Sequence, residues 1–189
     1  MKTLPREQAN EEWDRLWDSM ESEWFKVEVL QDYSAEDKGK SLDAWMAGDK
    51  ERSLELLRTE PNPWSEDCRA KVERGVKLTR IHVVDYPLSP YMQWEIEVYK
   101  MRNIPQGKES VFLVDRKNLE GVDLPAGDLM MFDQKNVVIG HYDETGYAHS
   151  QTFYDHTDDL ASFIALRRNI LDAPLEKVGE VSSPASINS

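Results

Sequence analysis

The sequence predicts an α/β (α+β) protein in which a mixed sheet of about five strands is flanked by helices and preceded by a helical N-terminal arm. Two patterns carry this prediction. Helical spacing and helix caps dominate the chain up to about residue 76, whereas short β-branched or apolar runs separated by turns dominate residues 79–154. Composition is a third observation, since 40% hydrophobic and 10% aromatic residues suffice to bury a core and exclude global disorder.

The first element is an aromatic helix within residues 7–28 that passes into a strand or turn. Residues 25–29 alternate as a short strand does. A helix this rich in tryptophan seldom stands alone in water, so we expect it to pack on its own domain or, alternatively, on a partner. Its apolar face is made by Trp13, Leu16, Trp17, Met20 and Trp24.

Three shorter helices are predicted before the first long strand, in residues 42–47, 51–58 and 65–76. Ser41 and Ser65 are the expected caps. The last of these helices has acidic residues in its first turn and basic residues at its end, as the helix dipole favours.

Five strands are predicted from β-branched and aromatic runs, in residues 79–84, 111–114, 129–132, 137–141 and 147–154. Turn-forming clusters at 133–136 and 143–146 join the later strands. Residues 91–102 allow two interpretations, because they alternate as a strand would, yet Ser89 and Pro90 provide a cap and a first-position proline. The cap favours a helix.

A closing helix is predicted after Asp155 or Thr157, either of which is a suitable cap. Its apolar face is made by Leu160, Phe163, Ile164 and Ile170 or Leu171. The polar residues that follow are expected to be a disordered tail. The predicted organisation is therefore a helical arm at 1–62, an α/β domain at 63–177 and a tail at 178–189.

The net charge is −13, from 36 acidic and 23 basic residues, and the first 60 residues hold 16 of the acidic ones. This charge argues against direct nucleic-acid binding, which requires a basic face. It permits a basic protein partner, such as a DNA-binding regulator. The alternative is that the acid serves solubility alone.

A cytoplasmic location is expected. The single cysteine, Cys68, excludes an internal disulfide framework and fits a reducing compartment. No apolar run approaches the roughly 18 residues of a membrane span, and residues 1–14 lack the apolar stretch of a secretory signal.

No catalytic residue, metal site or cofactor is assigned from motifs. The four histidines lack the spacing of a metal site. Cys68 is flanked by Glu66 and Asp67, which oppose thiolate formation. Nucleophile-elbow, Walker and dinucleotide-binding glycine patterns are absent, so the sequence predicts a protein that is not an enzyme.

Most of the chain resembles a family of uncharacterised proteins found widely in actinobacteria and often encoded beside helix-turn-helix regulators. The resemblance rests on residues 13–17 (Trp-Asp-Arg-Leu-Trp), 84–91 (Val-Asp-Tyr-Pro-Leu-Ser-Pro-Tyr), 103–107 (Asn-Ile-Pro-Gln-Gly), 128–133 (Asp-Leu-Met-Met-Phe-Asp) and 141–143 (His-Tyr-Asp). The C-terminal half is also similar in pattern to phospholipase-D-like sensor domains that have lost catalysis. No histidine is followed two positions later by lysine, so the catalytic motif of active members is missing.

That resemblance implies a sensor groove bordered by the helix at 90–102 and the turn at Asp133. The candidate ligand- or partner-binding residues are Tyr91, Trp94, Glu95, Asn103 and Asp133. Each also has an ordinary structural interpretation, as a core aromatic, a solvated charge or a turn residue.

The sequence therefore predicts a non-enzymatic regulatory or sensing protein that binds a protein partner, such as a helix-turn-helix DNA-binding regulator, through its acidic surface and aromatic arm. One alternative is a divalent-metal-dependent hydrolase or nuclease that uses Asp133, Glu95 and Asp143. Another is an acidic DNA mimic. The oligomeric state is not predicted.

Overall fold

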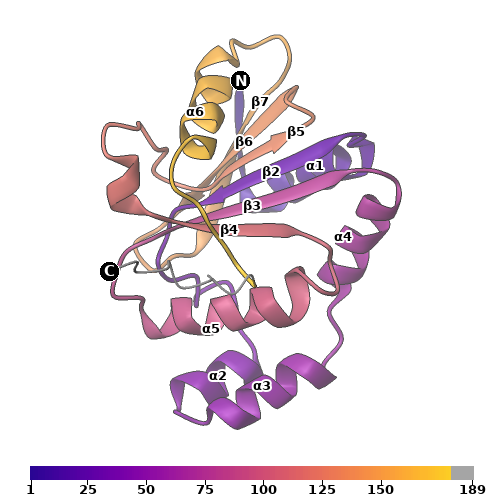
Figure 1. The fold of residues 1–189 in the computed structure, drawn as a ribbon. Coiled ribbons are helices and arrows are strands. Elements are labelled where there is room, and N and C mark those ends of the chain that lie inside the picture. Colours follow the sequence, from indigo (N-terminus) through magenta and orange to yellow (C-terminus); the bar gives the residue numbers. More distant parts are fainter. Residues whose placement is uncertain (180–189) are drawn as a thin grey trace, which may run out of the picture.

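The computed structural model describes residues 1–179 and places eight strands in one open mixed sheet, in the order β1-β7-β6-β5-β2-β3-β4-β8 (Figure 1). The predicted mixed sheet flanked by helices is confirmed, but the predicted number of strands, about five, was wrong. β1 and β8 are too short to give a periodic pattern, and β2 was assigned to the arm. The strands are β1 (Lys2–Pro5), β2 (Glu23–Glu28), β3 (Lys77–Val84), β4 (Ser110–Asp115), β5 (Leu129–Phe132), β6 (Asn136–Tyr142), β7 (Ala148–Tyr154) and β8 (Glu176–Lys177).

Strands β2, β3 and β4 are parallel neighbours, and the other pairs are antiparallel. Parallel neighbours need crossover connections, and helices supply them. α2 (Lys40–Met46), α3 (Lys50–Thr59) and α4 (Pro63–Glu73) connect β2 to β3. α5 (Pro90–Val98), continued by a π-helical turn at Tyr99–Asn103, connects β3 to β4.

Residues 1–62, expected to be a helical arm, contain β1 and β2 as well as helix α1 (Arg6–Ser19). β2 lies between β5 and β3 in the interior of the sheet. α1 packs on the sheet of its own chain through Leu16 and Trp17, which are buried with Trp24 of β2. The segment thus contributes to the sheet, while the boundary at residue 62 stays a prediction.

The helix predicted after Ser89 is present, because the Ser89 side chain accepts a hydrogen bond from the Met92 amide at 3.0 Å. Three other predicted caps were wrong. Ser41 lies inside α2, which begins after Gly39 without a side-chain cap. Ser65 lies inside α4, which Asn62 caps, and α6 (Ala161–Leu171) begins after Leu160 without a side-chain cap. Of the predicted tail, Val178 is buried and Gly179 lies in a turn, and residues 180–189 lie outside the described residues.

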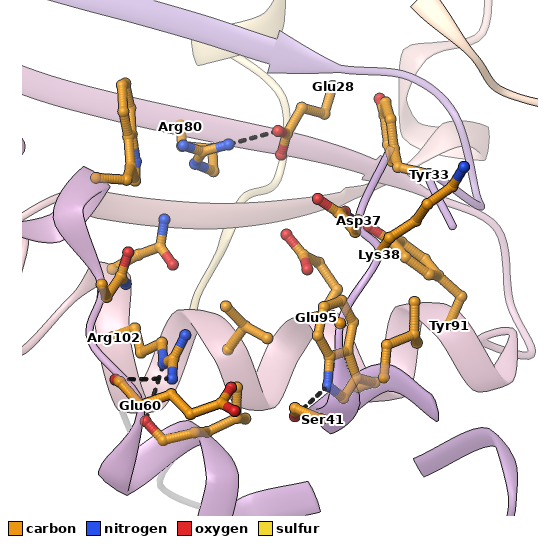
Figure 2. Close-up of a pocket in the computed structure, with 18 of the residues that line it drawn as sticks. Glu28, Tyr33, Asp37, Lys38, Ser41, Glu60, Arg80, Tyr91, Glu95 and Arg102 are labelled. Carbon is orange, nitrogen blue, oxygen red and sulfur yellow. Dashed lines mark hydrogen bonds and ion pairs between the residues drawn. The ribbon is translucent and has the colours of Figure 1, made fainter. Parts of the chain in front are cut away.

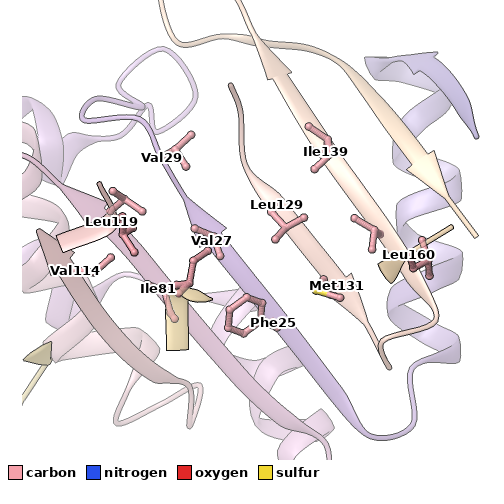
Figure 3. Close-up of a cluster of buried hydrophobic side chains, with 13 residues drawn as sticks. Phe25, Val27, Val29, Ile81, Val114, Leu119, Leu129, Met131, Ile139 and Leu160 are labelled. Atoms are coloured by element: carbon pink, nitrogen blue, oxygen red, sulfur yellow. The ribbon is translucent and has the colours of Figure 1, made fainter. Parts of the chain in front are cut away.

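Alternation along the central strands gives the sheet two different faces. Phe25, Val27 and Ile81 point to one face, which we call the apolar face (Figure 3). They pack with side chains of α6 and of the 3₁₀ turn Arg116–Leu119. The opposite face, the polar face, is covered by α1, α4 and α5, with α2 and α3 beyond α5 (Figure 1). It carries charged residues in the middle of the fold.

Within residues 1–179, no helix combines the length and apolar character needed to cross a bilayer.

Candidate functional site

A cavity of about 420 Å³ lies between the polar face and the helices that cover it (Figure 2). We call it the central cavity. Its floor comes from β2 and β3, its far wall from α5, and its rim from the segments that flank α2 and α3.

The floor is a buried ion-pair network. Lys26 and Glu28 lie two positions apart on β2, so both side chains face the cavity, and Arg80 lies beside them on β3. Lys26 Nζ is 2.7 Å from Glu28 Oε1, and Arg80 Nη1 donates to the same carboxylate. Burial alone would raise the pKa of Glu28, but the charges of Arg80 and Lys26 outweigh it and hold this pKa well below its ordinary value.

Arg80 also anchors a second carboxylate. Its Nε lies 2.8 Å from Glu109 Oε2, and Glu109 accepts further hydrogen bonds from Asn103 Nδ2 at 2.8 Å and Trp64 Nε1 at 3.0 Å. Burial opposes ionisation of Glu109, but Arg80 and these donors lower its pKa overall. Glu109 is therefore fully engaged.

A third carboxylate, Asp128, closes the end of the floor near Tyr33. It accepts hydrogen bonds from the hydroxyls of Tyr33 at 2.5 Å and Tyr142 at 2.8 Å, and from the amide of Val29 at 3.2 Å. Lys26 Nζ lies 3.5 Å from its second oxygen. This carboxylate is thus also engaged.

Two further carboxylates, Asp37 and Glu95, face the cavity from the opposite side. Figure 2 shows both pointing into the space that Glu28 also faces. Asp37 accepts a hydrogen bond from the Tyr91 hydroxyl, but neither carboxylate has an ion pair within 4.0 Å among residues 1–179. Burial raises the pKa of both, and the charges of Asp37 and Glu28 help raise that of Glu95 to about 8.

The basic residues at the rim do not neutralise this pair. Arg102 donates to the backbone carbonyls of Leu56, Leu57 and Glu60, so its guanidinium holds the end of α3. Lys38 is exposed, and its side chain points away from the cavity (Figure 2).

A smaller compartment of about 330 Å³ adjoins the central cavity and shares Lys26, Trp64 and Arg80 with it. Its other walls include Trp13 and Trp24, which belong to a cluster of stacked and edge-on tryptophan rings beneath α1. The shared wall therefore separates an aromatic compartment from the acidic one.

Four of the five residues predicted for the site, namely Tyr91, Trp94, Glu95 and Asn103, line the central cavity. Trp94 Nε1 donates to Ser41 Oγ at 3.0 Å and so ties α5 to α2. Whether these four bind a ligand or partner stays a prediction.

Asp133 lies elsewhere. At the β5–β6 turn, its carboxylate accepts hydrogen bonds from the amides of Glu21, Ser22 and Glu23 at 3.0, 2.7 and 3.0 Å. These bonds outweigh partial burial and lower its pKa. The geometry is that of a side chain that fixes the entry to β2.

Sequence reasoning missed the floor residues Lys26, Glu28 and Arg80, although a signal was available. Strands with parallel neighbours are usually covered on both faces and read as continuous apolar runs. Charged residues at alternate positions of such a strand are therefore buried and need a reason. Asp37 gave no such signal, because it lies in an irregular connection.

The carboxylates of the metal-dependent alternative do not converge. Asp133 and Asp143 flank the two ends of β6, and Glu95 lies on α5. No three His, Cys, Asp or Glu side chains within residues 1–179 are placed to hold a metal ion.

Two solved structures share part of this arrangement at low similarity. One is TrmBL2, an archaeal chromatin protein with a novel mode of DNA binding, at 10% identity and a TM-score of 0.41, covering 92% of this chain and 55% of that one. The other is phosphatidylserine synthase of Haemophilus influenzae Rd KW20, at 11% identity and a TM-score of 0.45, covering 93% and 38%. The chain thus spans little more than half of the first protein and under two fifths of the second.

No curated protein matches the sequence. Residues 11–176, which include the whole central sheet apart from β1 and the end of β8, match the family described as a domain of unknown function, DUF6879. The protein belongs to that family.

Proposed function

We propose that this protein is a non-enzymatic sensing or regulatory protein of the cytoplasm that binds a small polar ligand in the central cavity and responds by changing its contact with a protein partner. The observation that carries the proposal is the cavity itself. Its volume of about 420 Å³ falls in the range of small-molecule sites, and it combines aromatic walls with a few polar groups in fixed positions.

The state of the polar groups favours recognition over covalent chemistry. Glu28 accepts hydrogen bonds from Arg80 and Tyr99, so its carboxylate is not free to act as a nucleophile. Arg80 is likewise occupied, by Glu28 and Glu109. Cys68 lies against Glu109, and burial raises the pKa of its thiol far above the ordinary value. An unreactive thiol beside a carboxylate is not a nucleophile.

A connection from cavity to surface supports a regulatory role. The segment between β2 and α2 contributes Asp37 to the cavity, and its Glu36 is paired with Arg6 of α1, with side-chain distances of 2.5 and 2.7 Å. A ligand that contacts Asp37 therefore biases a segment that also holds the N-terminal helix. A ligand shifts the balance between two conformations of a protein only if it contacts them differently, and a contact to Asp37 in this segment provides such a difference.

The choice of partner rests on the sequence. The net charge of −13 suits a basic partner, and the resemblance to actinobacterial proteins encoded beside helix-turn-helix regulators suggests a DNA-binding regulator of that kind. The resemblance to non-catalytic phospholipase-D-like sensors agrees with a sensing role without assigning a ligand.

The test is affinity purification of the tagged full chain from its native host at low salt, followed by mass spectrometry of proteins and small molecules. Val98→Phe, which fills the cavity from α5, is compared with Ile96→Phe on another face of the same helix. We expect a specific protein partner whose recovery falls at high salt and changes with Val98→Phe but not with Ile96→Phe. Recovery of no specific partner by the unmodified chain would overturn the proposal.

A further inference from the structure

We propose that the ligand of the central cavity is an organic cation, a primary amine or a guanidinium compound, whose charged group sits between Asp37 and Glu95. This inference rests on the proposed function and names the chemical class of its ligand.

The charges around the cavity do not cancel. Six carboxylates lie on the cavity or directly behind its floor, whereas four basic side chains line it, Lys26 and Arg80 on the floor and Lys38 and Arg102 at the rim. Both floor cations are used by Glu28, Glu109 and Asp128, each of which has a basic nitrogen within 4.0 Å. Glu60 at the rim and the two carboxylates that face the cavity, Asp37 and Glu95, have none among the described residues.

Nothing at the rim corrects this deficit. Arg102 is occupied by three backbone carbonyls, and Lys38 points outward. Asp37 and Glu95 are partly buried, and a carboxylate that loses water without gaining a countercharge carries a desolvation penalty, which it relieves by binding a proton or a cation. The raised pKa of Glu95 corresponds to the first solution. A cationic ligand provides the second.

The walls suit the same ligand class. Tyr91 and Trp94 pack against each other with ring centroids 5.6 Å apart, and both line the cavity, so an aromatic surface adjoins the two carboxylates. Aromatic faces attract ammonium and guanidinium groups. Asp37, Glu95 and Glu28 face the same space, so an anionic ligand would be repelled there.

The shared wall orients the ligand. Lys26 and Arg80 separate the central cavity from the aromatic compartment, so the positive end of the ligand is disfavoured at this passage. We therefore place the amine or guanidinium on the α5 side of the cavity and the neutral part of the ligand toward Trp64.

The test uses probes of one length and three charges. Butylamine, 1-butanol and butyrate share a four-carbon chain and carry one positive, no and one negative charge, and butylguanidine replaces the amine with a guanidinium. Binding to the full chain is measured by calorimetry at pH 6, 7 and 8. We expect butylamine or butylguanidine to bind and the other two probes not to bind. Because one proton leaves Glu95 on binding, affinity should increase as the pH rises from 6 to 8, by up to about tenfold per pH unit.

Variants locate the site. Glu95→Gln is expected to weaken binding at least about tenfold and to flatten its pH dependence, the loss expected for a charge-assisted contact. Glu97→Gln, two residues away on the outer side of α5, should leave both unchanged. Equal binding by Glu95→Gln, or no binding by either cationic probe, overturns the inference. If butyrate binds and Val98→Phe abolishes that binding, the inference fails but the proposed function stands. If no probe binds and Val98→Phe leaves partner recovery unchanged, both fail.

Discussion

The two faces of the sheet differ in what they bury, although the same strands build both. On the apolar face, Phe25, Val27 and Ile81 lie among aliphatic side chains (Figure 3), and α6 packs against the same cluster. On the polar face, the intervening residues Lys26 and Arg80 form a charged network with Glu28, and Figure 2 shows Arg80 and Glu28 side by side in it. Adjacent residues of the same strands therefore point either into an apolar core, which stabilises the fold, or into a charged site, whose buried groups depend on one another.

The energetic consequences of the two faces are opposite. Burial of apolar surface contributes about 25 cal/mol per Å² to folding. A buried ion pair gives little net stability, because desolvation offsets most of the attraction between its charges. A fold that places six carboxylates and four basic side chains around one cavity thus gives up stability on that face, and burial on the apolar face compensates for it. Such an arrangement is a common mark of a functional site.

The largest expected effect is at the residue that joins the charged network. Arg80→Met keeps much of the side-chain volume but leaves Glu28 and Glu109 buried without their shared cation. We expect a loss of about 3–5 kcal/mol in the free energy of unfolding, measured by urea denaturation. Adding Glu28→Gln and Glu109→Gln should restore part of it. A loss below about 1 kcal/mol would mean that the network does not hold the polar face together.

A matched change on the apolar face should separate stability from ligand binding. Ile81 neighbours Arg80 on β3 and is fully buried, so Ile81→Ala is expected to cost about 2–4 kcal/mol by leaving a cavity. The affinity for a cationic probe should stay within about twofold, since Ile81 faces away from the central cavity. Ile81→Val, with a loss of about 1 kcal/mol, serves as the graded control. A large change in affinity would show that the two faces are coupled.

The architecture of the fold was predictable to the extent that periodicity encodes it. The apolar runs at 129–132 and 137–141 were long enough to mark β5 and β6, and Ser89 decided the helix at 90–98. β1 and β8 span four and two residues, which is too short for any period to be detected. Their place is determined by pairing with β7 and β4, distant in sequence.

The candidate site was predictable only in part, for a related reason. The cap at Ser89 placed Tyr91, Trp94 and Glu95 on one helix, and the structure brings them to the same cavity. Asp37 lies 58 positions before Glu95 and in no regular element, so only the crossover connection brings it near. Asp133 was a candidate because the resemblance placed its turn beside a sensor groove, whereas the structure uses its carboxylate to accept hydrogen bonds from backbone amides.

The unpaired carboxylate on α5 should reveal itself through pH. The pKa of Glu95 rises from about 4.5 to about 8 on folding, so the folded chain binds a proton that the unfolded chain lacks between these values. Stability from this group is present below pH 4.5 and is lost as the pH rises to 8. Glu95→Gln removes that loss. We expect its free energy of unfolding to exceed that of the unmodified chain by on the order of 2 kcal/mol at pH 8.5 and to equal it at pH 4.5.

Urea denaturation across pH 4.5–8.5 measures this difference, and Glu97→Gln is the control. Glu97 pairs with Lys100 at the surface of the same helix, so its replacement should change stability by less than about 0.5 kcal/mol. The paired carboxylates Glu28 and Glu109 act in the opposite sense, since their lowered pKa values give stability that is lost as the pH falls. If the difference in free energy of unfolding between Glu95→Gln and the unmodified chain does not change with pH, the proposed contrast between paired and unpaired carboxylates is wrong.

The smallest expected effect concerns the predicted site residue that lies outside the cavity. Asp133→Asn keeps a side chain that tolerates the positive φ of 52° at this position but removes the carboxylate that three amides share. We expect a loss of about 1 kcal/mol in the free energy of unfolding and no change in affinity for a cationic probe. Asp123→Asn, an exposed acid before β5, should change neither quantity. Weakened probe binding by Asp133→Asn with unchanged stability would instead place Asp133 in the site, and the division between a binding face and a structural turn would have to be redrawn.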